Sequence, residues 1–396
     1  MIYFVFFILV LICVLEFKSY TVSSLLSPWI INNLIWIFIA GGLIFYSHLF
    51  KPLYGDFLNC LLVWTVGFNL FSLLGYNKSS YRELKTCKKF SISNKVYNIF
   101  LIISLIATPM FVYKAYMNVG VLSAEIFNEF RYHSNNGDLS FGLLSRIQIF
   151  NQALLIITML FYSQISKYKV WFVIFANLMV SLVIAEKGSI LYLLTVLIYI
   201  LYLRKKINLK QIAYVGIITL GLFWGMNILR AWETGSHSSF GDFLALYTLS
   251  PSVAFDQLRP DIAGYFGLNT FPAFYILINL LTGSHYPIVS KLKDFVDVPN
   301  HVNVYTIMQP FYQDWGILGV FIFACIFGFI CGVVYKKTFG TSLIWNCYYI
   351  HLYYIIVTGF FQDNFFISIS ESAQLLFMFY LFSIIKTSKK ISYNLK

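Results

Sequence analysis

Apolar runs of about 20 residues, separated by short polar segments, occupy most of the chain. A helix of that length crosses the hydrocarbon core of a bilayer, whereas a membrane β-barrel shows shorter segments of alternating polarity. The pattern therefore predicts an all-α, polytopic membrane protein with about 11 transmembrane helices, within a range of roughly 10 to 12. The predicted helices lie at 2–17, 28–50, 53–75, 96–118, 141–163, 170–186, 189–203, 211–229, 316–335, 343–361 and 366–385.

One long polar segment, 230–315, interrupts this pattern and has apolar runs on both sides. Its many aromatic and apolar side chains distinguish it from a disordered tether, because disordered segments lack such residues. The run 270–281 is an amphipathic to apolar helix candidate for the membrane surface. We therefore expect a single membrane domain, 1–396, that contains a large, partly helical loop at 230–315.

The composition agrees with an integral membrane protein. Hydrophobic residues make up 59% of the chain and charged residues 11%, and the mean hydropathy is +0.75. A soluble domain is about one quarter charged, so this chain is too apolar to fold as a water-soluble globule. The net charge of +12 does not indicate a nucleic-acid partner, because the basic residues lie in short loops where they orient helices.

Four basic segments fall on one side of the membrane if the helix count is right. They are 76–95, 204–206, 336–337 and the tail that follows residue 385. By the positive-inside rule that side is cytoplasmic, and so is the C-terminus. The segments 119–140 and 230–315 and the turn at 186–187 are then extracytoplasmic.

None of the six cysteines lies in the 230–315 segment, and the chain has no CxxC pair. The loop is therefore not held by disulfides, and a cysteine-based redox or metal site is not expected. The histidines and acids of the loop also lack metal-ligand spacing, so we expect no metal. The N-terminal apolar run lacks a basic start and a cleavage site, and we interpret it as a retained helix.

Basic residues predicted to lie on the extracytoplasmic side are candidates for binding a pyrophosphate, because the positive-inside rule disfavours them there. These residues are Arg131, Arg230, Lys187 and Arg259. Arg131 precedes Gly142 by the same spacing as Arg230 precedes Gly241. A guanidinium group grips phosphate oxygens with two parallel hydrogen bonds. The alternative readings are an arginine that reaches lipid headgroups and, for the other two cations, a local ion pair or surface turn.

The candidate general bases are His301, Asp314 and Glu233. A histidine or a carboxylate close to a reacting hydroxyl can take its proton. Three aromatic residues are candidates for stacking on sugar rings: Tyr305, Tyr312 and Trp315. Alternatively, the three candidate bases are ordinary polar side chains with hydrogen-bond partners and no catalytic role. The three aromatic residues could instead belong to the belt of aromatic side chains at the membrane–water interface. The chain contains no nucleophile elbow, P-loop or dinucleotide fingerprint.

Short motifs in the same regions add a family resemblance. They are Asn-Val-Tyr-Thr at 303–306, Phe-Tyr-Gln-Asp-Trp-Gly at 311–316, Lys-Gly-Ser at 187–189 and Tyr-Thr-Leu-Ser-Pro at 247–251, together with the arginine-to-glycine spacings. This set resembles the O-antigen and oligosaccharide repeat-unit polymerases of the Wzy type. A large outer loop late in a chain of many helices is also similar to that family.

The resemblance implies a bacterial inner-membrane glycosyltransferase of lipopolysaccharide biosynthesis whose large loop and active site are periplasmic. It would move a growing glycan from undecaprenyl pyrophosphate to the non-reducing end of an incoming lipid-linked repeat unit. The resemblance implies no nucleotide sugar, cofactor or metal. The expected partners are undecaprenyl-pyrophosphate-linked oligosaccharides and the lipid bilayer, and whether a chain-length regulator binds is left open.

Two alternatives stay open. An O-antigen ligase has a similar helix count and outer loop, and differs in using the lipid A core as acceptor. A lipid-linked oligosaccharide flippase or other transporter belongs to another class, and should carry charged residues inside its helices along a central cavity. The sequence ranks transport below transfer, because helix interiors are nearly uncharged and the loop is large.

Overall fold

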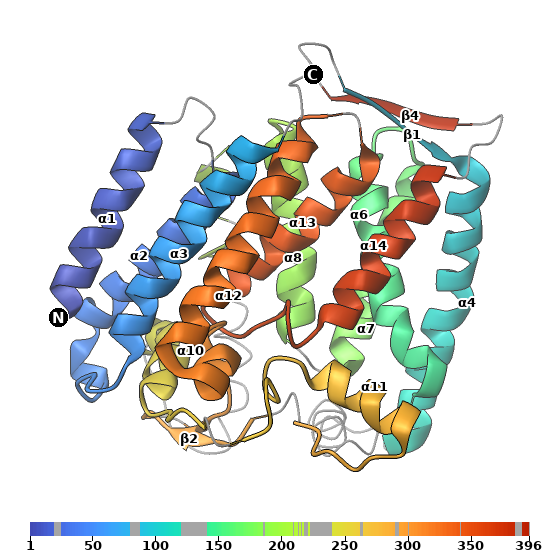
Figure 1. The fold of residues 1–396 in the computed structure, drawn as a ribbon. Helices are drawn as coiled ribbons and strands as arrows, with labels where there is room; N and C mark the ends of the chain where they lie inside the picture. The colour runs from blue at the N-terminus through green and yellow to red at the C-terminus, as the bar shows by residue number, and fades with distance from the viewer. Residues whose placement is uncertain are drawn as a thin grey trace. The chain divides into compact units, whose positions relative to one another are not determined.

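A computed structural model describes most of the chain (Figure 1). The described residues are 1–19, 25–79, 88–119, 141–184, 187–208, 210–212, 214, 216–217, 221, 240–261, 264–289, 293–299, 301–340, 342–384 and 390–395. They form helices and two small antiparallel sheets of two strands each.

Six helical stretches among the described residues are long and apolar enough to cross a membrane. They are Pro28–Phe45, Phe57–Lys78, Asn94–Met117, Gly142–Leu160, Lys167–Ile184 and Gln309–Thr338. Length and composition thus agree with the prediction, and the chain is an all-helical, multi-pass membrane protein. The exact number of spans stays a prediction.

The chain divides into two compact units, each made of segments that are distant in sequence. Unit 1 contains Met1–Ser79, Lys205–Tyr335 and Ile355–Ile369, and unit 2 contains Ser80–Arg204, Lys336–Tyr354 and Ser370–Lys396. Apolar helices form the frame of both units, and the prediction of a single membrane domain stays a prediction.

Unit 1 is built on three helices that lie side by side, with further elements from later in the chain (Figure 1). Its elements are α1 (Ile2–Ser19), α2 (Pro28–Phe45), η1 (Ser47–Leu49), α3 (Phe57–Lys78), α10 (Phe240–Asp256), α11 (Pro272–Thr282), the hairpin of β2 (Val296–Asp297) and β3 (His301–Val302), and most of α12 (Gln309–Thr338). Helix α10 packs against α2, α3 and β3.

Helices α3 and α12 approach each other through glycines, and small residues are what allow membrane helices to pack closely. A Cβ atom added at Gly332 would lie 1.9 Å from the carbonyl oxygen of Ser72, and one at Gly328 would lie 2.3 Å from that of Phe68. From the other side, a Cβ at Gly75 would lie 2.4 Å from the carbonyl oxygen of Phe329. The two backbones are therefore in direct contact along these turns.

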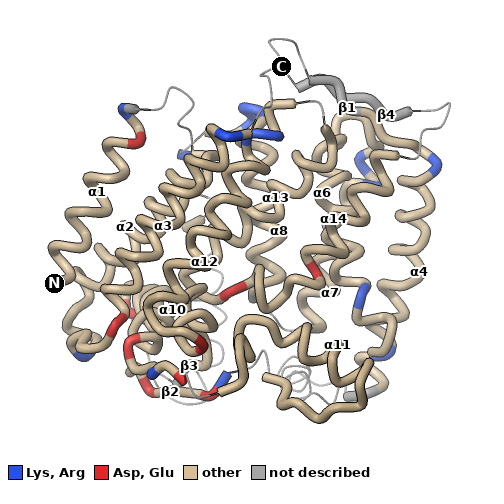
Figure 2. The backbone as a smooth tube through the Cα atoms, viewed as in Figure 1, with Lys and Arg blue, Asp and Glu red and all other residues tan. Residues whose placement is uncertain are grey.

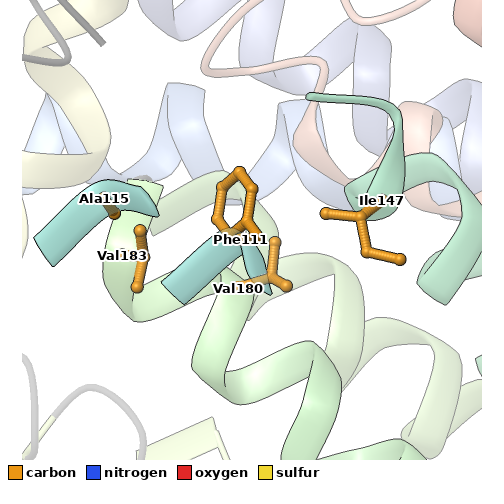
Figure 3. Packing of buried hydrophobic residues seen from close by; sticks show 5 residues of the cluster. All are labelled: Phe111, Ala115, Ile147, Val180 and Val183. Atoms are coloured by element: carbon orange, nitrogen blue, oxygen red, sulfur yellow. The ribbon is translucent and has the colours of Figure 1, made fainter. Parts of the chain in front are cut away.

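Unit 2 has its own apolar core and its own sheet. Its elements are β1 (Lys88–Ser93), α4 (Asn94–Val119), η2 (Gly142–Arg146), α6 (Ile147–Leu160), α7 (Lys167–Ile184), α8 (Lys187–Leu203), most of α13 (Leu343–Thr358), most of α14 (Ile369–Ile384) and β4 (Lys390–Leu395). One buried cluster brings together Phe111 and Ala115 of α4, Ile147 of α6, and Val180 and Val183 of α7 (Figure 3).

The basic segments of unit 2 gather at one end of its helices. Strand β1 pairs antiparallel with β4, and Lys88 and Lys89 lie opposite Leu395 and Asn394 of the C-terminal segment. At the same end Lys169 donates to Asn98 over 2.9 Å, and Arg204 donates to the carbonyl oxygen of Leu160. Segments that the sequence assigns to one side thus meet in this unit, and the identity of that side as cytoplasmic stays a prediction.

Several predicted boundaries are wrong. The helix expected at 28–50 ends at Phe45, and the next begins at Phe57 rather than at 53, because the intervening segment folds against the end of α10. Within the partly helical 230–315 segment the sequence analysis named only 270–281 as a helix candidate, and the structure adds α10, which contains Pro251 and buries apolar side chains. Of the helix predicted at 211–229, only 211–212, 214, 216–217 and 221 are described.

Candidate functional site

The polar groups of unit 1 gather around the first turns of α12. Acidic residues cluster at the end of the unit that carries α10, β2 and β3 (Figure 2). The loop 303–308 is tied to the α13–α14 loop there, because the Ile307 N–H donates to the Gly359 carbonyl oxygen over 2.7 Å. We call this region the polar end of unit 1. It comprises 53–57, 257–271, 293–316 and 359–368, within the residues that the structure describes.

Five of the ten candidate residues have described side chains, and all five lie at the polar end: Arg259, Tyr305, Tyr312, Asp314 and Trp315. Arg131, Arg230 and Glu233 lie outside the described residues. The backbone of Lys187 begins α8 and that of His301 lies in β3, but their side chains are not described. The structure therefore brings half of the predicted site together and leaves the other half as a prediction.

Asp314 is buried and accepts four hydrogen bonds. One carboxylate oxygen accepts from the backbone and side-chain amides of Asn269, at 3.1 and 2.9 Å. The other accepts from the backbone N–H and the hydroxyl of Thr270, at 2.8 and 2.7 Å. A carboxylate satisfied in this way holds the 257–271 loop against α12. A role as general base would require one of these donors to give way to a substrate hydroxyl.

Helix α12 is broken directly after Asp314. Trp315 has φ −143° and ψ 15°, and Gly316 has φ 62° and ψ −152°, a conformation that only glycine adopts readily. The Gln313 carbonyl oxygen accepts the Asp261 N–H over 2.7 Å. The sequence predicted that the helix begins at residue 316, whereas the structure extends it back to Gln309 across this break.

Two of the three predicted sugar-stacking residues, Trp315 and Tyr312, pack against other residues of unit 1. Trp315 stacks on Phe323, with centroids 5.2 Å apart, and lies edge-on to Phe266 and Phe271. Tyr312 is buried, and its hydroxyl donates to the Asp56 carboxylate over 2.7 Å. These contacts give both rings a packing function in the described structure.

Arg259 is an exposed cation at this end of the unit. It follows α10, whose last residue Asp256 accepts the N–H groups of Tyr54 and Gly55 over 2.9 Å each. The helix end is thereby fixed to the 53–57 segment. Arg259 follows this anchored helix end by three residues, and its role in binding pyrophosphate stays a prediction.

Lys293 is a cation that the sequence analysis did not single out. Burial lowers the pKa of its ammonium group, while the carboxylates of Asp314, Asp294 and Asp363 oppose that shift. Its ammonium group donates a long hydrogen bond, 3.5 Å, to the side-chain oxygen of Asn269. A lysine in a segment rich in acids carries no motif, so only the tertiary structure reveals it.

Asp363 lies at the start of the segment that leads into α14. Its carboxylate accepts the N–H groups of Phe365, Phe366 and Ile367 at 2.9, 3.2 and 3.0 Å. Burial nevertheless raises its pKa to about 6, against these hydrogen bonds and the charge of Lys293. The protonated form is therefore favoured by folding.

This shift predicts a pH dependence of stability. A carboxyl group whose pKa is raised in the folded state contributes stability below its unfolded pKa, and that contribution is lost as pH rises through the folded value of about 6. Comparison of melting curves of the wild type and Asp363→Asn should give a difference that changes by about 3 kcal/mol between roughly pH 4 and pH 7, in favour of the variant. The exposed Asp261→Asn serves as control, and a difference that does not vary with pH would contradict the prediction.

The described residues contain no group of three or more metal-ligating side chains that could hold a metal ion. Comparison of the chain with protein-family models, with curated protein sequences and with solved structures gave no match. The class that fold and composition define is thus a multi-pass helical membrane protein with a folded polar end.

Proposed function

We propose that the chain is a membrane glycosyltransferase of the repeat-unit polymerase type. It joins undecaprenyl-pyrophosphate-linked oligosaccharides into polysaccharide at the periplasmic face of the bacterial inner membrane. The observation that carries this proposal is the folded polar end of unit 1, where carboxylates, Lys293 and Arg259 are held at the ends of apolar helices. A reaction between two lipid-borne, polar substrates needs polar groups at that position.

The chemistry needs a cation and a proton acceptor. The bond between the glycan and the pyrophosphate breaks, and a hydroxyl of the incoming repeat unit forms the new glycosidic bond and gives up its proton. The developing charge on the leaving pyrophosphate requires fixed cations, for which Arg131, Arg230, Lys187 and Arg259 are the candidates. His301, Asp314 and Glu233 are the candidate acceptors of the proton.

The proposed topology follows the sequence. About 11 helices cross the membrane, the 230–315 loop is periplasmic, and the basic segments and C-terminus are cytoplasmic. A buried carboxyl in the helices of unit 1, Glu16, is the observation that supports a flippase or transporter as the second candidate. A deletion strain separates the polymerase from both alternatives, because loss of a polymerase leaves one repeat unit on the lipid A core, whereas loss of a ligase or a flippase leaves the bare core.

Arg230→Ala is expected to abolish polymerisation, because the arginine would hold the leaving pyrophosphate. A deletion strain that expresses this variant at the wild-type level should make lipopolysaccharide with a single repeat unit, which gel electrophoresis detects. Arg146→Ala, at the exposed Arg146 of η2, is the matched control and should restore the full ladder of chain lengths. A normal ladder of chain lengths from the Arg230→Ala variant would show that polymerisation does not need this arginine.

A further inference from the structure

A chain of buried hydrogen bonds links α1, α2 and α3 in unit 1. The indole N–H groups of Trp36 and Trp64 both donate to the side-chain oxygen of Asn32. The Asn32 amide donates to Asn69, the Asn69 amide donates to Asn33, and the Asn33 amide donates to the carboxyl group of Glu16. All six side chains are buried: Glu16, Asn32, Asn33, Trp36, Trp64 and Asn69.

Every bond in this chain points the same way. Each amide accepts on its oxygen and donates from its nitrogen to the next group, so the chain polarises toward Glu16. The bonds also shorten in that direction, from 3.3 and 3.2 Å at Trp64 and Trp36 to 3.2, 2.6 and 2.5 Å.

Two opposing effects thus act on the charge of Glu16. Burial among apolar helices disfavours the carboxylate, because a charged group loses its hydration there. The directed amide chain favours the carboxylate, because it presents a polarised N–H to the oxygen. The balance of these two effects decides whether Glu16 is charged or neutral.

We propose that Glu16 is a proton-binding site inside the helices of unit 1, and that its hydrogen-bonded chain carries the protonation state to Trp64. The carboxylate takes a proton from water and becomes a neutral carboxylic acid. The loss of charge weakens the Asn33 hydrogen bond and then the bonds behind it. The Trp64 ring, which stacks on Phe311 of α12 with centroids 6.1 Å apart, reports the change.

Few other titratable groups lie on the helices that pack around Glu16. Helix α1 also carries Tyr3, Cys13 and Lys18, α2 carries none, and α3 carries Cys60, Tyr76 and Lys78. Glu16 lies about one turn from the end of α1, close to Lys18 in the sequence. Protons are therefore expected to enter from that end of the helix.

The test uses the purified full-length protein in lipid nanodiscs, titrated from about pH 4 to about pH 9, a range that covers carboxyl groups with ordinary and raised pKa values. Infrared difference spectra should show a protonated carboxyl band that Glu16→Gln lacks. Tryptophan fluorescence should show a pH-dependent component that Glu16→Gln abolishes and Trp64→Phe reduces. Trp171→Phe, at an exposed tryptophan of unit 2, should leave this component in place.

The asparagines of the hydrogen-bonded chain provide a second test of the proposal. Asn33→Ala removes the donor to Glu16 and should move the carboxyl titration to higher pH, and Asn69→Ala should move it in the same direction by less. If Glu16→Gln does not fold, infrared spectra of wild-type protein with isotope-labelled glutamate and these asparagine variants still decide the question. Because burial also raises the pKa of Asp363 into this range, the spectra are compared in an Asp363→Asn background. A difference spectrum that Glu16→Gln leaves unchanged there, or a titration that neither asparagine variant moves, would show that the chain only packs the helices.

Discussion

Gly332→Ala is expected to destabilise unit 1 strongly. The new Cβ atom would lie 1.9 Å from the Ser72 carbonyl oxygen, which belongs to a helix backbone and cannot rotate away as a side chain would. Helices α3 and α12 must then separate. Overpacking costs about 1–3 kcal/mol, occasionally more, and we expect the upper end of this range. Thermal unfolding in detergent, together with the yield of monodisperse protein, measures the effect.

The matched control is Gly216→Ala, because a Cβ at Gly216 meets no atom of the described residues within 4 Å. Alanine is favoured over glycine in a helix by about 1 kcal/mol, so this variant should melt at or above the wild-type temperature. Adding Gly328→Ala to Gly332→Ala should prevent folding of the unit, since the second Cβ lies 2.3 Å from the Phe68 carbonyl oxygen. Wild-type melting of Gly332→Ala would mean that α3 and α12 are not in backbone contact.

The membrane helices were the part of this fold that the sequence could predict. Residues 96–118 are predicted as a helix and α4 runs from Asn94 to Val119, because bilayer thickness dictates a long apolar run. The same pattern does not reveal how closely helices pack. Gly328 and Gly332 form a Gly-x-x-x-Gly motif, yet only the structure shows that α3 is the helix they contact.

The candidate site was predictable only in part, for a related reason. Asp314 and Arg259 are recognisable as polar residues in an apolar chain. The partners of Asp314 are Asn269 and Thr270, which precede it by 45 and 44 residues. Such a contact depends on the break at Gly316 and on the path of the intervening loop. No local sequence pattern predicts the helix break or the path of the loop. Nothing near Lys293 in the sequence marks it as a site residue either.

Asp314→Ala is expected to be the most damaging change at the polar end. It leaves four donors of Asn269 and Thr270 without their acceptor, at a cost of about 1–3 kcal/mol for each donor that water cannot reach. The 257–271 loop should detach from α12, with a large fall in melting temperature. Asp294→Ala is the control, because that neighbouring side chain is exposed and should leave the melting temperature close to the wild-type value.

Asp314→Asn separates the two roles that this residue can have. The amide keeps one acceptor oxygen but turns an N–H toward a donor, so a structural Asp314 predicts an intermediate melting temperature, with polymerisation falling in proportion to the folded protein. A general base predicts a different pattern, in which the asparagine variant melts like the wild type and makes only single-repeat lipopolysaccharide. Because all four donors are already satisfied by the carboxylate, we expect the first pattern. The second would place Asp314 ahead of His301 and Glu233 among the candidate bases.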